Sequence, residues 1–597
     1  MDKQINIKIE SKDIFDSVKS DNLDLLKKII TENPELINTK DELGRTPLIW
    51  ACRNSSTELI EYLLNMGADV NLADNNNIAP VHILASKGDS KNMEMLLTKD
   101  ADVDFKAGTG LTALHYNSIP EGIFQQRVLI YIQLLSKGAD HTMRNKNGDT
   151  PLNFAVENSV DREMIKTLLN YNADYNAEGN RASLLMQKAA QYGFRDFFIE
   201  LLKKEGKRVL DDKTQKDLIV KSAAIGGETD ILKTLTDMGF SIDTGKNVYG
   251  LTLIHYAAKY GHEVMIEYLT KLGVDINSRN NVGESAYNIA EKNGNKKIME
   301  LILKLGGNDE AAEFTVLKGK YLGQTVPGMK PEIFAPGIIS TDEYEGCSGW
   351  GKNMEYFVFQ RWTDNVQKLC IMNRNEDDSW TEPEEIPFGE EYQCGDFTIA
   401  PDGKTLLFAS RKDTQEYGLK SEGTSIWKSI KTQEGWTEPE LLKSPINSEY
   451  NESYPCMASN GNLYFFSMRP GGFGRSDLYM SELVDGEYKC AVNMGPDFNS
   501  ENYEWDPFIA PDESYIIFCS MNPGGPCDYM YVSFKNEDGT WGKPVYLGDD
   551  INSDKSDNRP YVTPDGKYLF FCSRRSGEGD IYWVDAKILG ELKKKQI

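Results

Sequence analysis

The sequence lacks any apolar stretch long enough to cross a membrane. A membrane-spanning helix needs about 20 consecutive, mainly apolar residues, and the 597-residue chain contains no such run. The first ten residues also lack the unbroken apolar core and the cleavage site of a secretory signal. We therefore expect a cytoplasmic protein that does not act at a membrane.

Histidine is scarce, and the second half of the chain has none. The five histidines all precede residue 263, which excludes histidine-based catalytic triads and histidine-rich metal sites from the C-terminal half. No P-loop, no His-Glu-x-x-His and no dinucleotide-binding glycine pattern occurs anywhere in the chain. We therefore predict no cofactor and no metal.

Cysteines show no sign of a disulfide framework. Their number is odd, nine, and no Cys-x-x-Cys pair occurs. Cys519 and Cys572 stand inside apolar runs at matching places, as small buried hydrophobic residues do. This pattern favours a reducing compartment.

Positive charge is in deficit. The chain has 66 Lys and Arg against 92 Asp and Glu, a net charge of −26, and most of the excess follows residue 316. Such an acidic half repels phosphate backbones and anionic lipids. We therefore expect neither nucleic acid nor a membrane surface as a partner.

The C-terminal half contains a repeated strand–turn–strand pattern. The turn Pro564-Asp565-Gly566 precedes the apolar run Tyr568–Ser573, and Pro and Gly fit the backbone angles of tight turns. Similar turns recur every 52 to 58 residues, at Gly351, Gly403, Gly461 and Glu513. Five all-strand units at this period predict a β-propeller of five blades, with six as the alternative.

The propeller is expected to close on itself. Four units end in a further short segment, such as Pro439-Glu440-Leu441-Leu442, and the last unit has none. The missing piece stands in front of the first unit, at residues 331–340. We therefore predict that this N-terminal piece forms the outer strand of the last blade, which protects exposed strand edges.

The N-terminal half has a different period. Thr46-Pro47-Leu48 is echoed 33 residues later by Ala79-Pro80-Val81-His82, and again at Thr112, Thr150, Thr252 and Ser285. Thr suits a helix N-cap and Pro the first helical position, and apolar residues at helical spacing follow. Each unit therefore predicts two short helices.

These residues resemble the ankyrin repeat, with its 33-residue period and Thr-Pro-Leu-His signature. The resemblance covers about residues 11–309 and implies eight or nine units, of which the first is a cap, and a groove that binds a protein. It also implies a structural role for the histidines of the signature. All five histidines lie in this array: His82, His115, His141, His255 and His262.

The C-terminal units resemble WD-repeat-like propellers of the TolB type, through their Pro-Asp-Gly turns and blade endings such as Gly579-Asp580-Ile581-Tyr582. That resemblance implies binding or scaffolding. The expected fold is thus multidomain α + β. Its parts are an α-helical ankyrin solenoid (1–312), a linker (313–330), an all-β propeller (331–586) and a C-terminal tail (587–597).

Acidic residues occur near the start of each expected inner strand, which lines the channel of a propeller. We expect them to form a ring at one mouth, where they could bind a ligand. Glu452 and Asp506 are the weak catalytic candidates for glycoside cleavage, which needs two carboxyl groups; Ca²⁺ binding, or solvated and backbone-bonded acids, remain open. The candidate residues are Glu345, Asp396, Glu452, Glu504, Asp506, Asp557 and the neighbouring Arg559.

Basic residues recur after the second strand of several units, at Lys412, Arg469 and Arg575. We expect the pairs Arg469–Asp477 and Arg575–Asp580 to close blade hairpins by charge-assisted hydrogen bonds.

Neither half shows an evident catalytic constellation. The main hypothesis is an interaction scaffold, whose ankyrin groove binds a protein partner and whose propeller binds a second ligand, a glycan or a peptide. The alternative is a carbohydrate-active enzyme or lectin that uses the carboxylates at the propeller mouth.

Overall fold

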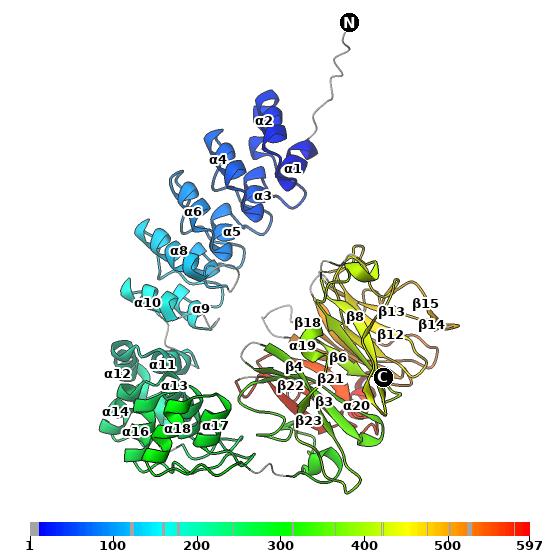
Figure 1. Ribbon diagram of the computed structural model, residues 1–597. Coiled ribbons are helices and arrows are strands. Elements are labelled where there is room, and N and C mark those ends of the chain that lie inside the picture. Colours follow the sequence, from blue (N-terminus) through cyan, green and yellow to red (C-terminus); the bar gives the residue numbers. More distant parts are fainter. Residues whose placement is uncertain are drawn as a thin grey trace. The chain divides into compact units, whose positions relative to one another are not determined.

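The computed structural model describes most of the chain (Figure 1). Contacts divide the chain into two compact units. One comprises Met1–Thr244, Leu253–Asp275 and Asn295–Leu305, and the other comprises Gly245–Thr252, Ile276–Gly294 and Gly306–Ile597. The described residues are 11–119, 124–157, 162–175, 180–242, 244–312, 316–363, 366–419, 421, 423–474, 476–500, 503–521, 528–577 and 579–596.

Short helices follow one another in pairs through the N-terminal half (Figure 1). Their inward faces carry Leu, Ile and Ala that are fully buried, such as Leu59, Leu63 and Leu96. The helices are α1 (Ser11–Lys19), α2 (Leu23–Glu32), α3 (Pro47–Asn54), α4 (Thr57–Asn65), α5 (Pro80–Lys87), α6 (Ser90–Leu97), α7 (Ala113–Tyr116), α8 (Phe124–Ser136), α9 (Pro151–Glu157), α10 (Arg162–Asn170), α11 (Asn180–Tyr192), α12 (Arg195–Asp211), α13 (Lys213–Gly226), α14 (Thr229–Asp237), α15 (Leu253–Lys259), α16 (Glu263–Lys271), α17 (Ala286–Lys292) and α18 (Lys296–Lys304).

The Thr-Pro-Leu-His signature works as its residue types require. Thr46 Oγ1 accepts a hydrogen bond from Ile49 N at 3.3 Å and caps α3, and Pro47 is the first helical residue. His82 is fully buried: its Nδ1 accepts from Ala79 N at 3.0 Å, and its Nε2 bonds to the carbonyl of Phe105 at 2.9 Å. The histidine thus ties its helix to the next connecting loop, which is the structural role expected.

The C-terminal half is a ring of five antiparallel sheets, four with four strands and one with a fifth short strand, β9 (Gly435–Trp436), beside β8 (Figure 1). The expectation of five blades is confirmed, and the alternative of six is wrong. In order from inner to outer strand, blade 1 is β2 (Tyr344–Trp350), β3 (Tyr356–Thr363), β4 (Val366–Asn373) and β5 (Glu384–Glu385); blade 2 is β6 (Phe397–Ile399), β7 (Thr405–Ser410), β8 (Ser425–Thr432) and β10 (Glu440–Leu441); blade 3 is β11 (Glu452–Met457), β12 (Leu463–Ser467), β13 (Asp477–Ser481) and β16 (Val492–Asn493); blade 4 is β17 (Glu504–Ile509), β18 (Tyr515–Met521), β19 (Asp528–Phe534) and β20 (Val545–Tyr546); blade 5 is β21 (Asp557–Val562), β22 (Tyr568–Ser573), β23 (Asp580–Asp585) and β1 (Glu332–Ile333).

The ring closes through its first strand. β1 pairs antiparallel with β23, Glu332 opposite Trp583 and Ile333 opposite Tyr582. The next residue, Phe334, is fully buried, and its ring lies 4.9 Å from that of Phe570 and 5.1 Å from that of Trp583. Closure by the N-terminal piece is therefore confirmed.

Segments outside the blades also join the propeller core. Within the expected linker, Tyr321 is buried and its hydroxyl donates to Asp565 Oδ2 at 2.6 Å. Within the expected tail, helix α20 (Lys587–Gln596) buries Leu589 and Leu592 in the same apolar cluster. Both segments thus stabilise the ring.

Candidate ligand site at the propeller channel

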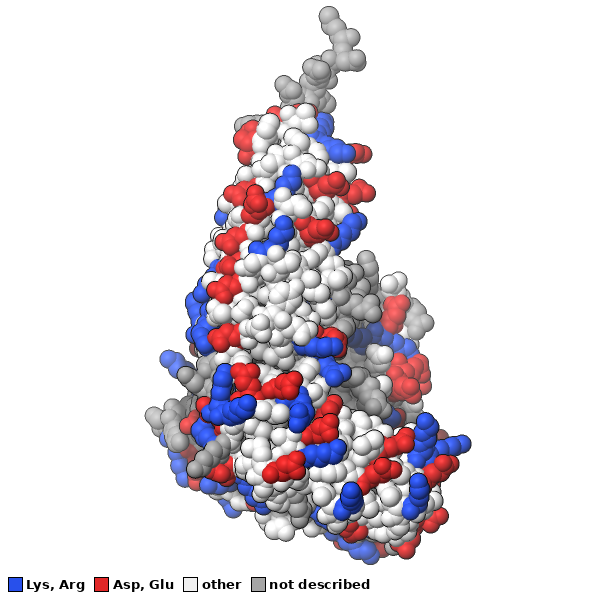
Figure 2. Space-filling view, turned by 90° about the vertical axis from the view of Figure 1, so that its left-hand side faces the viewer, with Lys and Arg blue, Asp and Glu red and all other residues white. Residues whose placement is uncertain are grey.

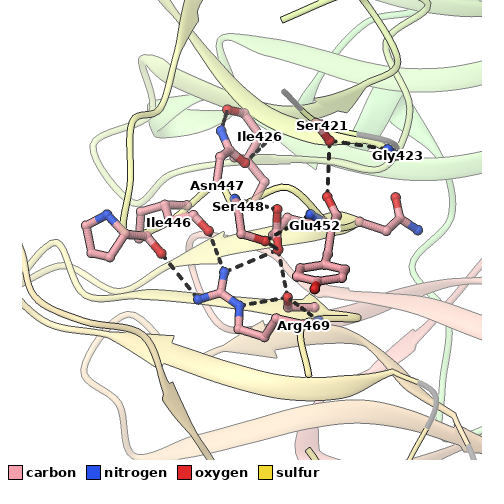
Figure 3. Close-up of polar contacts among 12 residues, drawn as sticks. Ser421, Gly423, Ile426, Ile446, Asn447, Ser448, Glu452 and Arg469 are labelled. Atoms are coloured by element: carbon pink, nitrogen blue, oxygen red, sulfur yellow. Dashed lines mark hydrogen bonds and ion pairs between the residues drawn. The ribbon is translucent and has the colours of Figure 1, made fainter. Parts of the chain in front are cut away.

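Glu452, at the start of β11, is held in a closed set of hydrogen bonds (Figure 3). The side chain has no exposed surface. It accepts from Ser448 N at 2.9 Å, Ser448 Oγ at 2.6 Å and Ser467 Oγ at 2.7 Å, and it pairs with Arg469 Nη2 at 3.3 Å. We call such a set a blade latch: an acid, the Ser or Thr four residues before it, and an Arg or Ser from the end of the second strand.

Three other blades repeat the latch. Glu345, Glu504 and Asp557 are each fully buried and accept from the main-chain N–H and the hydroxyl of the residue four positions earlier. Arg361 pairs with Glu345 at 2.8 Å and Arg575 with Asp557 at 2.8 Å. Ser520 Oγ donates to Glu504 at 3.0 Å.

The latch arginines also hold the chain that enters the blade. Arg469 Nη2 donates to the carbonyl of Ile446 at 2.7 Å (Figure 3), and Arg361 donates to the carbonyl of Ile339 at 2.9 Å. The expected pairs of Arg469 with Asp477 and of Arg575 with Asp580 are therefore wrong. The carboxylate of Asp477 instead accepts main-chain N–H groups of its own loop, from Phe473 at 2.6 Å and Gly474 at 3.0 Å.

The asparagine directly before the latch serine forms hydrogen bonds with the third strand of the preceding blade. Asn447 Oδ1 accepts from Ile426 N at 2.8 Å, and its Nδ2 donates to Ile426 O at 2.8 Å (Figure 3). Asn499 and Asn552 bond in the same way to Leu478 and Met530. The sequence analysis did not predict this role of the asparagine. A pattern in the sequence could have indicated it: an Asn-Ser pair recurs, each time with an acid four residues after the serine.

Four of the seven candidate residues therefore lie inside blades. Glu345, Glu452, Glu504 and Asp557 do not form the expected ring at one mouth, because their carboxylates turn into the latches. Burial raises the pKa of Glu345 to about 7, while Arg361 and Thr341 act in the opposite direction. Ligand contact by these four acids remains a prediction.

The other three candidates line two cavities beside the inner strands, and ligand binding by them remains a prediction. The pairing shifts within four of the five inner strands, as between Ser453 and Cys456 in β11. The residue two positions after the latch acid, or after Cys394 in blade 2, lines a cavity, and three of these five residues have a positive φ, between 51° and 57°. We call the five residues at this place the channel ring: Cys347, Asp396, Tyr454, Asp506 and Arg559.

Arg559 connects the channel ring. Its N–H donates to Asp506 Oδ2 at 2.9 Å, and its Nη2 lies 3.5 Å from Asp396 Oδ1. Its guanidinium also bonds to the hydroxyl of Tyr344 and lies 5.6 Å from the centre of that ring. The structure thus brings together Asp396, Asp506 and Arg559, but no hydrogen bond joins Glu452 to Asp506 in the described part of the chain.

Several polar atoms at this place have no protein partner among the described residues. They are Asp506 Oδ1, Arg559 Nε and Trp362 Nε1. Asp506 is only 4% exposed. Burial raises its pKa to about 7, with Arg559 acting in the opposite direction. All three atoms are enclosed by protein and present no surface to a cavity.

Two cavities meet at the ring. The smaller one, of about 30 Å³, is lined by residues of the inner strands, Asp506 among them. The wider one, of about 580 Å³, is lined by residues of blades 1 and 2, including Trp362 and Asp396. Tyr454 and Arg559 line both cavities, which we together call the funnel.

The described residues hold neither a cluster suited to a metal ion nor a helix suited to a bilayer. Within the ranges given above, no group of three or more His, Cys, Asp or Glu side chains is arranged to hold a metal ion. No described helix has the length and apolar character needed to cross a bilayer.

A known family matches the helical half. A model of ankyrin repeats, in three copies, matches residues 14–107, 123–217 and 220–313. Among curated proteins, the chain is 25% identical over 304 residues to human transient receptor potential cation channel subfamily A member 1, which covers 48% of this chain and 26% of that protein.

Two other relatives match shorter stretches. The chain is 31% identical over 143 residues to the chicken nuclear factor NF-kappa-B p105 subunit, covering 22% of this chain and 14% of that protein. It is 38% identical over 90 residues to chicken inversin, covering 15% and 8% respectively. The chain thus spans about a quarter or less of each relative. Its N-terminal half is a region of ankyrin repeats, and a five-bladed β-propeller follows it.

Proposed function

We propose that this chain is an interaction scaffold, in which the groove of the ankyrin array binds a protein partner and the funnel of the propeller binds a second ligand. Stacked repeats build extended rigid surfaces that suit protein recognition. Fold alone does not define function, so the proposal depends on specific residues in each half.

Trp50 carries the proposal for the array. This half-buried residue lies on α3, the first helix of its pair, and its Nε1 donates to Asp41 Oδ2 at 2.9 Å. Three cations surround its ring: Lys19 at 4.6 Å, Arg45 at 5.0 Å and Arg53 at 5.7 Å from the ring centre. Trp and Arg are the residues that most often dominate binding energy at interfaces. An acidic segment of a partner suits this positive, aromatic patch.

The second helices offer a different surface. On the face shown in Figure 2, charges of both signs are interspersed, and an area with few charged side chains lies midway along the array. Helix α8 has one charged residue, the buried Arg127, whereas Leu129 is 50% exposed and Ile132 is 40% exposed. This apolar area is the competing place for a protein partner.

The test compares these two faces in the full-length chain. Proteins captured from the native host's lysate by the wild type are identified and then measured with Trp50→Ala, with Lys19→Glu, and with the control Leu129→Ala. We expect capture of the partner to fall about tenfold or more with Trp50→Ala, because truncated hot spots cost 2 kcal/mol or more, roughly. Lys19 is exposed, so Lys19→Glu tests the patch without disturbing the core.

If only Leu129→Ala loses capture, the partner binds the second helices, and the assignment of the partner to the groove is wrong. A wild-type chain that retains no specific protein would overturn the scaffold proposal itself. Melting temperatures of all variants show whether any loss results from unfolding.

A carbohydrate-binding propeller is the second candidate, because a tryptophan and carboxylates line one cavity. Glycoside cleavage by Glu452 and Asp506 is less well supported, since the carboxylate of Glu452 is fully buried in its latch. We therefore propose a binding function for the propeller and not an enzymatic one.

We further propose that the chain acts in the cytoplasm and that its propeller belongs with the WD-repeat-like, TolB-type group. Eight described cysteines are free thiols, which suits a reducing compartment. The Pro-Asp-Gly turns support the propeller assignment. A fluorescent fusion observed in the native host would test the location.

A further inference from the structure

We propose that a cavity in blade 4 binds a guanidinium group, which a free small molecule or an arginine side chain of another protein supplies. In blades 3 and 5 an arginine of the chain itself lies at the matching place, whereas the described residues of blade 4 supply no cation there. The cavity shares no lining residue with the funnel, so this inference goes beyond the proposed function and does not depend on it.

Arg469 and Arg575 have the same surroundings in blades 3 and 5. The Nε of each donates to the hydroxyl of the serine that ends the second strand, Ser467 at 2.9 Å and Ser573 at 2.8 Å. Each guanidinium also lies between 5.0 and 5.5 Å from the centres of two stacked aromatic rings, a distance at which a cation is attracted to the ring. The rings are those of Phe465 and Tyr479 in blade 3, and of Phe571 and Tyr582 in blade 5.

Blade 4 repeats these surroundings but has a different residue at the position of the arginine. Ser520 lies opposite the latch acid Glu504, as the second-strand serine does in blades 3 and 5. The rings of Phe518 and Tyr531 are stacked with their centres 6.0 Å apart. Two residues after Ser520 the sequence has Asn522, which lies outside the described residues. A cavity of about 180 Å³ is lined by Ser520, Phe518 and Tyr531.

The walls of this cavity offer surface to a ligand. Ser520 is partly exposed, whereas Ser467 is 1% exposed and Ser573 has no exposed surface. Tyr531 is also partly exposed, and Asp497, a further lining residue, is exposed. The hydroxyl oxygen of Ser520 has two lone pairs and can accept a hydrogen bond from a ligand while it donates to the latch acid.

The acids at the cavity favour a cation. Glu504 accepts hydrogen bonds from the N–H and the hydroxyl of Ser500 and from the hydroxyl of Ser520, which suits an ionised carboxylate. It has no exposed surface, so a ligand acts on its charge from beyond Ser520 and not by contact. Asp497 adds a second acid, and the described lining includes no Lys or Arg. A buried charge without a counter-charge is costly, so a cation in this cavity is favoured.

The shape of the site favours a guanidinium over an ammonium. In blade 3 the guanidinium of Arg469 donates to the carbonyls of Pro445 at 3.3 Å and Ile446 at 2.7 Å, besides Ser467. The matching residues before blade 4, Asp497 and Phe498, line the cavity. A flat group with several N–H donors in a fixed fork, and with a face that stacks on aromatic rings, fits such a set of acceptors better than one ammonium does.

The test is saturation-transfer NMR on the full-length chain with methylguanidinium as the probe. Methylammonium has the charge without the flat fork, and N-methylurea has a flat shape without the charge. We expect methylguanidinium to bind and both counterparts to bind more weakly. Arginine and N-acetyl-arginine N-methylamide then separate the two sources, since the second resembles an arginine inside a protein chain. The tighter binder of these two names the source, and binding of either supports a guanidinium site.

Two variants place the binding in blade 4. Tyr531→Leu should weaken binding of methylguanidinium about fivefold, the usual effect of one cation–π contact. Tyr450→Leu, at an exposed tyrosine that does not line the cavity, should leave binding unchanged. Asn522→Arg supplies from the chain itself the arginine that blades 3 and 5 have, and should abolish binding. Gln433→Arg is its control, since it adds the same charge at an exposed position of the chain after β8.

The inference is wrong if methylguanidinium does not bind, if N-methylurea binds as tightly, or if both Tyr531→Leu and Asn522→Arg bind methylguanidinium as the wild type does. Equal binding of methylammonium would overturn the guanidinium class. Melting temperatures show whether a variant is folded, and if Tyr531→Leu is destabilised, Asn522→Arg decides alone.

Discussion

Carboxylates serve two different purposes within a few residues of each other in this propeller. The acid that begins an inner strand is enclosed by hydroxyl, main-chain N–H and guanidinium donors, as Glu452 is. The ring residue two positions later, such as Asp506, keeps an oxygen without a protein partner. The first arrangement gives both oxygens of the carboxylate protein donors, and the second leaves one buried oxygen without any.

The latch predicts a large loss of stability when its acid is removed. Glu452→Ala leaves the mostly buried Arg469 without its partner, and breaking a buried ion pair costs about 3–5 kcal/mol. Urea unfolding followed by tryptophan fluorescence measures this, because eight of the nine tryptophans belong to the propeller half. Glu440→Ala is the control: it removes an exposed pair with Lys428, of which Glu440 is 65% exposed, and should cost about 1 kcal/mol or less. Equal losses in the two variants would show that the latch contributes nothing special.

Asp506 predicts a specific dependence of stability on pH. Burial raises its pKa to about 7, with Asp396 and Asp528 acting in the same direction and Arg559 against it. Because an unfolded Asp titrates near a pKa of about 3.9, the folded state binds this proton more tightly. The stabilisation is complete below about pH 4 and is lost as the pH rises through about 7.

Asp506→Asn cannot titrate at this position. Its melting temperature relative to the wild type should therefore rise between about pH 4 and pH 7 and then level off. Glu487→Gln, at an exposed carboxylate, should follow the wild type. If the melting temperatures of Asp506→Asn and the wild type change in parallel with pH, the raised pKa of Asp506 is wrong.

Among the elements, the short closing strand β1 is expected to contribute strongly to the stability of the propeller. β1 has only two residues, yet it covers the edge of β23 and leads directly into the buried Phe334. Phe334→Ala should lower the free energy of unfolding of the propeller by about 3–5 kcal/mol, the usual cost of Phe→Ala in a core. Val326→Ala, at a position 53% exposed just before the strand, should change it by about 0.5 kcal/mol or less. A small loss for Phe334→Ala would mean that the ring closes without this segment.

The sequence allowed the blades and their closure to be predicted because both depend on local patterns. Turns such as Pro564-Asp565-Gly566 mark each hairpin, and a unit without its last strand points to a donor elsewhere. The channel ring was not predicted, although a proline follows Tyr454, Asp506 and Arg559 at the place where the pairing of the inner strand shifts, and a proline within a strand marks such an irregularity. Which of these residues meet depends on how the blades are arranged around the ring, and no local pattern states that arrangement.

Blade 2 shows a second limit of sequence reasoning. Cys394 stands where the other blades have the latch acid, and the short helix α19 (Gly389–Tyr392) precedes it. Ser410 Oγ bonds to the carbonyl of Tyr392, and Lys412 lies 3.7 Å from the centre of the Tyr392 ring. Lys412 also pairs with Glu391 at 2.7 Å, so this blade uses Glu391 and Tyr392 of α19 where its neighbours use the acid of the inner strand.

For the whole molecule, the two halves differ in how far apart their contacts lie along the chain. Ankyrin units contact their neighbours in the sequence, so each can form as soon as the next is present. The propeller ring requires Glu332 to meet Trp583, which is nearly the full length of that half away. Topologies dominated by such distant contacts fold more slowly.

The position of β1 also matters while the protein is being made. At roughly 5–20 residues per second, the ribosome needs on the order of 10–50 s after making β1 before its partner β23 exists. Throughout that time blade 5 is missing, and the edges of the unfinished sheets are open to pairing with other chains or to chaperones. A message truncated in any blade would therefore produce a chain that cannot close its ring, whereas the ankyrin array ahead of it would already be complete.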